Sequence, residues 1–274
     1  MEYERLVVQK EGHIATVTLN RPKVGNAFDF GAMEEIDHVF RDNLDKDSDV
    51  RAVILTGAGD YFCTGLDLTM FASSEPQVDV ASARVQDETE QVPWGKGSIV
   101  GAVAVMKSMG KPVIAAVNGP AVGLGCSLAL ACDIRIASDR ARFGMMFVKR
   151  GLAPDTGGSF TLPRIVGFAK ATELLLTGDT IDASEAQRIG MVSTVVPHDE
   201  LMTCARELVQ KIAKYPPLAV AITKEALNRS VAETDIVEQM KREVEYQDKM
   251  LNTEDFKEAA AAFLEKREPV FKGK

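Results

Sequence analysis

The sequence is poor in the residues on which disulfide, metal and nucleic-acid chemistry depend. Its 274 residues include only 3 histidines and 4 cysteines, and acidic side chains outnumber basic ones by 40 to 32. Without a cluster of Lys and Arg, we expect no nucleic-acid-binding face. The cysteines, Cys63, Cys126, Cys132 and Cys204, have apolar neighbours and no paired spacing. We therefore expect buried thiols in a reducing compartment rather than disulfides or zinc ligands.

Long apolar runs are also lacking. The longest, such as 113–117, are far shorter than the roughly 20 residues that span a bilayer, so no membrane partner is expected. The charged segment 1–10 has no apolar centre of a secretory signal, and residues 270–274 are not a peroxisomal address. The rest is ordinary globular composition, 46% hydrophobic with a net charge of -8. Together these features predict a cytoplasmic enzyme, and helix N-termini could still bind an anionic ligand.

Hydrophobic patterns predict an α/β layered domain in the first two thirds of the chain. Short apolar runs at 52–56 and 113–117 are typical of buried strands, a further strand is expected at 133–137, and helical patterns occupy 26–43 and 99–109. Two further runs near the N-terminus, 6–8 and 13–19, predict a hairpin. Strands that alternate with helices indicate sheet and helix layers around one core.

The character of the chain changes after residue 198. Four helical patterns follow, at 200–214, 218–229, 236–251 and 253–267. We therefore divide the chain into a core, 1–198, and a helical C-terminal region, 199–274, whose amphipathic helices pack either on another subunit or on their own domain. The polar segment 73–97, which carries Asp87, Glu88 and Glu90, predicts a mobile excursion over a pocket and a possible source of a second acid.

Two glycine-bearing loops each follow a buried strand. The first is 60–68, with Gly65, and the second is 118–127, with Gly123 and Gly125, which leads into a helix. Glycine at such a turn allows backbone N–H groups to point into a crevice without a side chain in the way. One such loop is most simply a tight turn, whereas two of them favour a site.

Other motif interpretations of these loops fail. Residues 125–129 nearly match the Gly-x-Ser-x-Gly turn of α/β-hydrolases, but Ala129 replaces the last glycine. The segments 57–59 and 123–125 are fragments of a dinucleotide-binding fingerprint that lack its third glycine, so NAD binding is not expected.

The motifs around the two loops resemble the crotonase, or enoyl-CoA hydratase/isomerase, superfamily. The resemblance covers essentially the whole chain in family order and is carried by the segments 18–23, 26–27, 62–68, 111–119, 151–158, 162–164 and 263–267. It implies an α/β fold, a crotonase-like spiral of ββα units with a helical C-terminal trimerisation region, in a homotrimer or dimer of trimers. It also implies an acyl-CoA thioester substrate. Coenzyme A is then part of the substrate, with no separate cofactor and no metal.

The resemblance assigns the oxyanion hole to two backbone N–H groups, those of Leu66 and Leu124. Fixed donors stabilise the negative charge that develops on the thioester oxygen, and one donor is worth about 3–4 kcal/mol. The resemblance further implies substrate or coenzyme A contacts, with the last two residues of the set reaching a neighbouring subunit: Lys23, Val24, Ala27, Thr64, Gly65, Asp67, Leu68, Gly123, Ser127, Phe147, Phe263 and Lys266.

The resemblance also bears on the reaction. Hydratases of the family use two glutamates, and the matching positions here are Ser127 and Phe147. Asp155 occupies a position where an acid occurs in isomerases of the dienoyl-CoA and ring-opening epoxyphenylacetyl-CoA type, and in a chlorobenzoyl-CoA dehalogenase. One carboxylate suffices for a 1,3-proton shift, and apolar surroundings should raise its pKa. We therefore expect an acyl-CoA isomerase with Asp155 as the proton carrier.

Several alternatives stay open at this point. They are an enoyl-CoA hydratase, an acyl-CoA hydrolase or dehalogenase, and a catalytically silent acyl-CoA-binding protein. Asp155 is also a favoured N-cap for a helix beginning near Thr156. A dehalogenase needs a histidine base, and His13, His38 and His198 all lie elsewhere in the family pattern. The sequence does not reveal the acyl chain.

Overall fold

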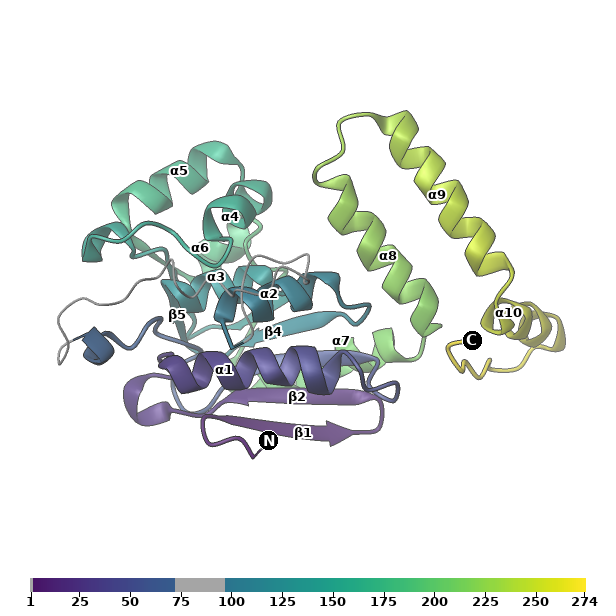
Figure 1. The fold of residues 1–274 in the computed structure, drawn as a ribbon, viewed down its shortest axis with the longest axis horizontal. Helices are drawn as coiled ribbons and strands as arrows, with labels where there is room; N and C mark the ends of the chain where they lie inside the picture. Colours follow the sequence, from purple (N-terminus) through teal and green to yellow (C-terminus); the bar gives the residue numbers. More distant parts are fainter. Residues whose placement is uncertain (1, 72–96) are drawn as a thin grey trace.

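The computed structural model describes residues 2–71 and 97–274, which form two sheets and their covering helices (Figure 1). The main sheet has the order β1-β2-β3-β4-β6-β9. In this sheet β1 and β2 pair antiparallel, as the predicted hairpin, and the other neighbouring strands pair in parallel. Its strands are β1 (Leu6–Glu11), β2 (Ile14–Leu19), β3 (Ala52–Gly57), β4 (Val113–Val117), β6 (Ile134–Ser138) and β9 (Thr194–Val196).

The second, smaller sheet shows how the chain repeats. It contains β5 (Pro120–Val122), β7 (Arg142–Gly144) and β8 (Thr180–Asp182). One unit runs β4, β5 and α3 (Leu124–Ala131), and the next runs β6, β7 and α4 (Gly158–Val166). Because β4 pairs with β6 in one sheet and β5 with β7 in the other, successive units stack in parallel register. The predicted crotonase-like spiral of ββα units is confirmed. Two further helices follow, α5 (Phe168–Thr177) and α6 (Ala183–Arg188).

Helices cover both faces of the main sheet. Alternate residues of each strand point to opposite faces, so Val53 and Leu55 pack into the larger core while Ala52 and Ile54 pack into the smaller one. The larger core is covered by α3, by α2 (Ile99–Ser108), and by α1 (Phe30–His38), which continues as a wider helical turn, Val39–Leu44. On the opposite face of the sheet, α7 (Leu201–Ala213) covers the smaller core.

The packing of α7 corrects the predicted division of the chain. Leu201, Ala205 and Val209 are buried against the sheet, so α7 belongs to the core, although the boundary at 198–199 placed it in the C-terminal region. The amphipathic pattern identified the helix but does not say which surface its apolar face meets. By packing, the projecting region begins with α8.

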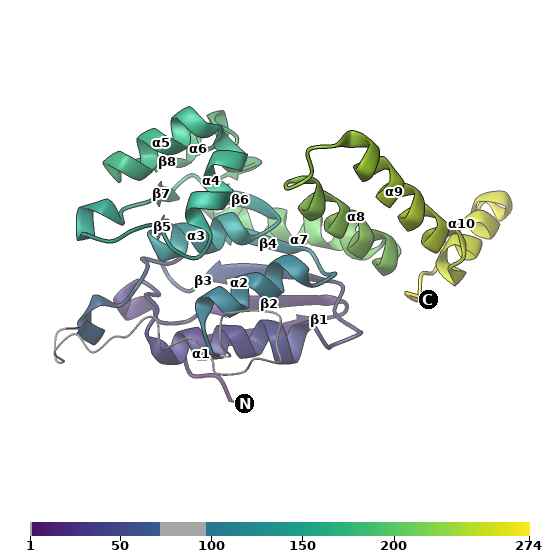
Figure 2. The same ribbon diagram turned by 45° about the horizontal axis from the view of Figure 1, so that its top comes forward.

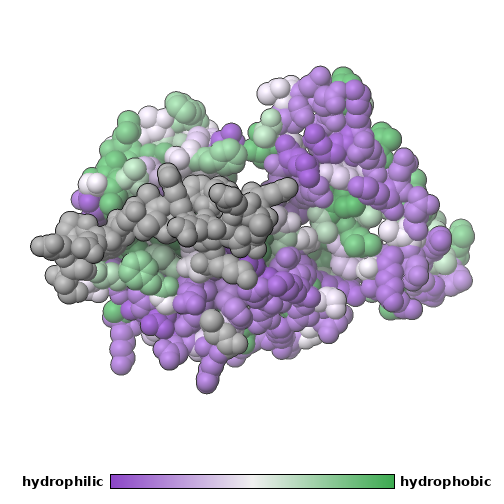
Figure 3. Space-filling view, in the orientation of Figure 1, coloured by the Kyte–Doolittle hydropathy of each residue, from purple (hydrophilic) through white to green (hydrophobic). Residues whose placement is uncertain are grey.

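Three helices project to one side of the core in both views (Figures 1 and 2): α8 (Pro217–Ser230), α9 (Ile236–Leu251) and α10 (Glu254–Glu265). Lys224 anchors α8 because its Nζ binds the carbonyl oxygens of Met106 and Lys111 and the Asp133 carboxylate, at 2.6, 2.9 and 2.8 Å. The mainly hydrophilic surface of these helices is broken by exposed apolar side chains such as Ile236 and Phe263 (Figure 3). Packing of this region on other subunits remains a prediction.

Three of the four cysteines are buried as the sequence predicts, and Cys204 is half-buried. All four are free thiols, and burial raises the pKa of Cys63, Cys126 and Cys132 to about 12, so these three are unreactive near neutral pH. Within residues 2–71 and 97–274, no helix is long and apolar enough to cross a membrane, and no cluster of His, Cys, Asp and Glu is placed to hold a metal ion. Residues 72–96, which include nearly all of the predicted mobile excursion and its three acids, lie outside the described residues.

Candidate active site

The two glycine loops meet side by side. Cys63 pairs with Ala121 in a parallel bridge, and the N–H of Val122 donates to the Cys63 carbonyl at 3.0 Å. A Cβ atom placed on Gly65 would lie 3.0 Å from the Val122 oxygen and 3.6 Å from the Leu124 nitrogen. The φ of Gly65 is 99°, a conformation that L side chains rarely adopt. Glycine at this position therefore allows the first loop to approach the second.

The direction of the Leu66 N–H follows from its neighbours. The N–H of Phe28 donates to the Gly65 carbonyl at 2.8 Å, and the N–H of Asp67 donates to the Phe28 carbonyl at 2.9 Å. The Gly65 carbonyl and the Leu66 N–H belong to one trans peptide plane and point in opposite directions. The Leu66 N–H therefore points away from Phe28, and it has no hydrogen-bond partner among the described residues.

The Leu124 N–H is available for a different reason. Leu124 is the first residue of α3, and the first N–H groups of a helix have no partner within it. Gly123 precedes it with φ 54° and ψ -125° and provides no side-chain cap. In the described part of the chain, the Leu124 N–H has no acceptor. Because every residue of α3 is buried, this helix end offers a positive potential in a water-poor environment.

Asp155 lies in the loop before α4 and does not cap that helix. The N-cap is Gly157, with φ 76° and no side-chain cap, and the Asp155 carboxylate instead accepts from the Thr156 hydroxyl at 3.0 Å. Thr156 is buried with φ 52°, a strained conformation for a β-branched residue. Such strain is often found at functional sites. The capping alternative for Asp155 is therefore wrong in this structure.

This loop packs on the first turn of α3, which also carries the Leu124 amide. A Cβ atom on Gly158 would lie 2.6 Å from Ser127 Oγ, and the Gly158 N–H donates to the Asp155 carbonyl at 2.8 Å. The Asp155 residue is exposed, yet enough protein surrounds its carboxyl group that desolvation raises its pKa, and the Thr156 hydrogen bond offsets this only in part. Asp155 therefore holds a proton more readily than an ordinary aspartate.

Ser127 and Phe147, which the resemblance matches to the glutamates of the hydratases, are buried. Among the described residues, Ser127 Oγ is the buried side-chain oxygen that has no hydrogen-bond partner. Phe147 adds apolar surface on the loop that leads to Asp155. Contact of either side chain with substrate remains a prediction.

The residues expected to contact coenzyme A lie partly together. Lys23 and Val24 are exposed on the short 3₁₀ turn Pro22–Val24, and the Thr64 hydroxyl donates to the Val24 carbonyl at 3.3 Å. This contact ties the turn to the loop of Leu66, and Leu68 is exposed on the same loop. Ala27 is buried behind them. The structure therefore brings this half of the predicted set together beside the loop of Leu66.

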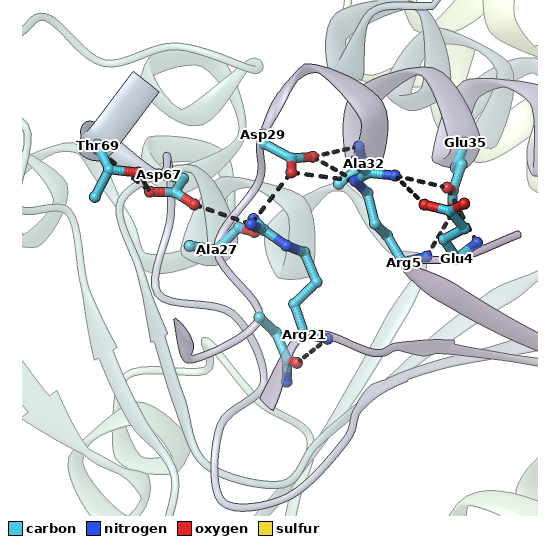
Figure 4. Close-up of polar contacts among 10 residues, drawn as sticks. Glu4, Arg5, Arg21, Ala27, Asp29, Ala32, Glu35, Asp67 and Thr69 are labelled. Carbon is cyan, nitrogen blue, oxygen red and sulfur yellow. Dashed lines mark hydrogen bonds and ion pairs between the residues drawn. The ribbon is translucent and has the colours of Figure 1, made fainter. Parts of the chain in front are cut away.

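The Asp67 carboxylate already accepts hydrogen bonds from neighbouring side chains of the protein. Its carboxylate accepts from the Thr69 hydroxyl at 2.6 Å and from Arg21 at 3.1 Å, and these bonds lower its pKa (Figure 4). A carboxylate held in this way is a poor proton acceptor near the loops, in contrast to Asp155. Arg21 was not among the predicted site residues, although it stands in one of the segments, 18–23, that carry the resemblance.

Two predicted residues lie apart from the others in the single chain. Phe263 and Lys266 are on or just after α10, which lies at the opposite end of the molecule from β5 and α4 in both ribbon views (Figures 1 and 2). Phe263 is 83% exposed, so it is free to contact another subunit, as expected. That contact remains a prediction.

The three histidines lie elsewhere, with partners of their own. His38 contacts the Tyr3 hydroxyl, His13 contacts the Asp49 carbonyl, and His198 contacts the Ser138 hydroxyl. A histidine base for dehalogenation is therefore not supported.

Comparison with known proteins identifies the family of the chain. The family model for enoyl-CoA hydratase/isomerase matches residues 9–274. The chain is 41% identical to the short-chain-enoyl-CoA hydratase of Clostridium acetobutylicum, with 97% of both chains covered, and 37% identical to the crotonyl-CoA hydratase of Syntrophomonas wolfei, with 99% of both covered. The crystal structure of an enoyl-CoA hydratase from Bacillus anthracis superposes with a TM-score of 0.90 at 33% identity, covering 99% of this chain and 100% of that one. The chain therefore belongs to the enoyl-CoA hydratase/isomerase family.

Proposed function

We propose that this family member is an acyl-CoA isomerase in which Asp155 carries a proton between two carbons of an enoyl thioester. The observation that supports the proposal is the position of Asp155, with its raised pKa, in the loop that leads into α4 and packs at Gly158 against the first turn of α3, the turn that presents the Leu124 amide. A side chain that first accepts and then returns a proton benefits from such a pKa.

The reaction follows from this arrangement. The thioester oxygen accepts hydrogen bonds from the N–H groups of Leu66 and Leu124, which stabilises the enolate that forms when a proton leaves C2. The Asp155 carboxylate takes that proton, and the electron pair spreads over C2 to C4. Asp155 then delivers the proton to C4, so that a 3-enoyl thioester becomes a 2-enoyl thioester with no net gain or loss of atoms.

Hydration is the alternative, and the names of the relatives favour it. A hydratase must activate a water molecule and also protonate a carbon, which suits two carboxylates on one face of the substrate. Here Ser127 and Phe147 replace those acids. Asp155 would then have to perform both proton transfers, and for this reason we place hydration second.

The test compares Asp155→Asn with wild type on 3-enoyl-CoA substrates. Removing the proton carrier should lower kcat by about 10²–10⁴-fold while KM changes little. Asp179→Asn is the matched control, because Asp179 is exposed, its carboxylate pairs with Lys149, and its backbone N–H donates to the Thr177 hydroxyl. Full turnover by Asp155→Asn would refute the mechanism. Tight binding of acyl-CoA without turnover by wild type would instead identify a binding protein.

A further inference from the structure

We infer that Arg21 is a positioning residue for the Leu66 amide and acts through Asp67. The inference rests on the proposed role of that amide as a donor to the thioester oxygen. It concerns how the Leu66 amide is kept in place. In this role Asp67 binds Arg21, whereas the family resemblance implies that it contacts coenzyme A.

The Leu66 segment is held by very little regular structure. Leu66 and Phe28 form an isolated bridge, one residue pair long, with the two backbone hydrogen bonds at Gly65 and Asp67. These two bonds set the direction of the peptide plane that carries the Leu66 N–H, but among the described residues no neighbouring pair continues the ladder to hold that plane against rotation. An oxyanion donor must keep its direction to be effective.

Arg21 joins the two sides of this short bridge. One terminal nitrogen of its guanidinium donates to the Ala27 carbonyl at 2.5 Å, on the residue before Phe28, and the other donates to Asp67 at 3.1 Å, on the residue after Leu66 (Figure 4). The second nitrogen also lies 3.2 Å from Asp29. The planar fork of arginine can hold two acceptors at a fixed spacing, which the single nitrogen of lysine cannot.

The burial of this pair supports the role. The Arg21 and Asp67 side chains are only 22% and 10% exposed, so their interaction is less screened than that of a surface ion pair. Thr69 holds the other Asp67 oxygen through its hydroxyl at 2.6 Å and its N–H at 3.2 Å, which leaves the carboxylate little freedom. Asp67 therefore transmits the position of Arg21 to the peptide that it adjoins.

Arg5 provides a matched control. It belongs to the same polar network and binds Asp29 and Glu35, but it does not contact Ala27 or Asp67 (Figure 4). Removing Arg5 should affect stability in a similar way and leave the Leu66 amide in place.

The experiment measures the infrared carbonyl band of a saturated acyl-CoA, isotopically labelled at the thioester carbonyl, bound to wild type, Arg21→Gln, Asp67→Asn and Arg5→Gln. In wild type and Arg5→Gln the band should shift to lower frequency on binding. In Arg21→Gln and Asp67→Asn at least half of that shift should be lost. The kcat of Arg21→Gln and of Asp67→Asn should fall about tenfold to a hundredfold, which is less than the ~10²–10³-fold expected for complete loss of one donor. The kcat of Arg5→Gln should stay at the wild-type value. KM should change little, and Arg21→Lys should recover only part of the loss.

A full carbonyl shift and full kcat in folded Arg21→Gln or Asp67→Asn would overturn the inference and leave the proposed function intact. If the wild type itself shows no shift, the proposed oxyanion hole is wrong. Asp67→Asn keeps the size of the side chain, so the test stands even if Arg21→Gln fails to fold.

Discussion

Gly65→Ala should separate the role of the glycine loops in catalysis from their role in folding. The added Cβ would lie 3.0 Å from the Val122 oxygen and 3.6 Å from the Leu124 nitrogen, in the place where the two loops meet. One loop must then move by a few tenths of an ångström, and the two N–H groups lose their common target.

The expected effect of Gly65→Ala has two parts, a loss of stability and a fall in kcat. An L side chain at the φ of 99° found for Gly65 costs about 1–3 kcal/mol of stability. Misplacing the Leu66 amide should lower kcat by at least tenfold, up to the ~10²–10³-fold seen when one oxyanion donor is removed.

Gly12→Ala is the control. Gly12 has a φ of 55° in the turn between β1 and β2, and a Cβ atom there would meet nothing within 4 Å. Urea unfolding should show a loss of stability in both variants, about 1–2 kcal/mol for Gly12→Ala. Steady-state kinetics should show a fall in kcat only for Gly65→Ala. Unchanged kcat in folded Gly65→Ala would refute the claim that the two amides act together.

Four further results are expected. Turnover should fall as pH decreases through a value above the ordinary aspartate pKa, because the raised pKa of Asp155 protonates the base early, and a pH-rate profile without this limb would count against it. Since folding raises that pKa, Asp155 loses stabilising effect as pH rises through it, so Asp155→Asn should be at least as stable as wild type at neutral pH. Ser127→Ala should be neutral or stabilising by about 1 kcal/mol in urea, because the hydroxyl is buried without a partner in the described structure, and a clear loss would reveal a partner. Lys224→Met should cost about 3–5 kcal/mol, against less than about 1 for the exposed Lys241→Met, and equal losses would contradict the anchoring of α8.

The sequence predicted the elements with strong periodicity. The apolar runs that became β3 and β4 are buried on both faces, so they are nearly continuous and easy to recognise. The strands β5, β7 and β8 are three residues long, too short for an alternation to show. They were therefore not predicted, although β5 leads directly into the Leu124 loop.

Some features of the site were likewise predicted from the sequence, and others were not. The amides of Leu66 and Leu124 were assigned from the family resemblance, and the structure brings their loops together. The capping role considered for Asp155 was wrong because Thr156 and Gly157 both adopt positive φ before the helix begins, which no local pattern indicated. Arg21 was missed because its partner Asp67 lies 46 positions away, and only the fold brings the two together.

The most direct test of the central claim is the identity of the product. Wild-type enzyme would be incubated separately with a 3-enoyl-CoA and with the corresponding 2-enoyl-CoA, and the products identified by NMR and mass spectrometry. Isomerisation through Asp155 predicts that the 3-enoyl thioester becomes the 2-enoyl thioester with no change in mass in ordinary water. It also predicts no 3-hydroxyacyl product from either substrate. Accumulation of a 3-hydroxyacyl-CoA, heavier by one water, at a rate equal to or above isomerisation would contradict the account and establish hydration.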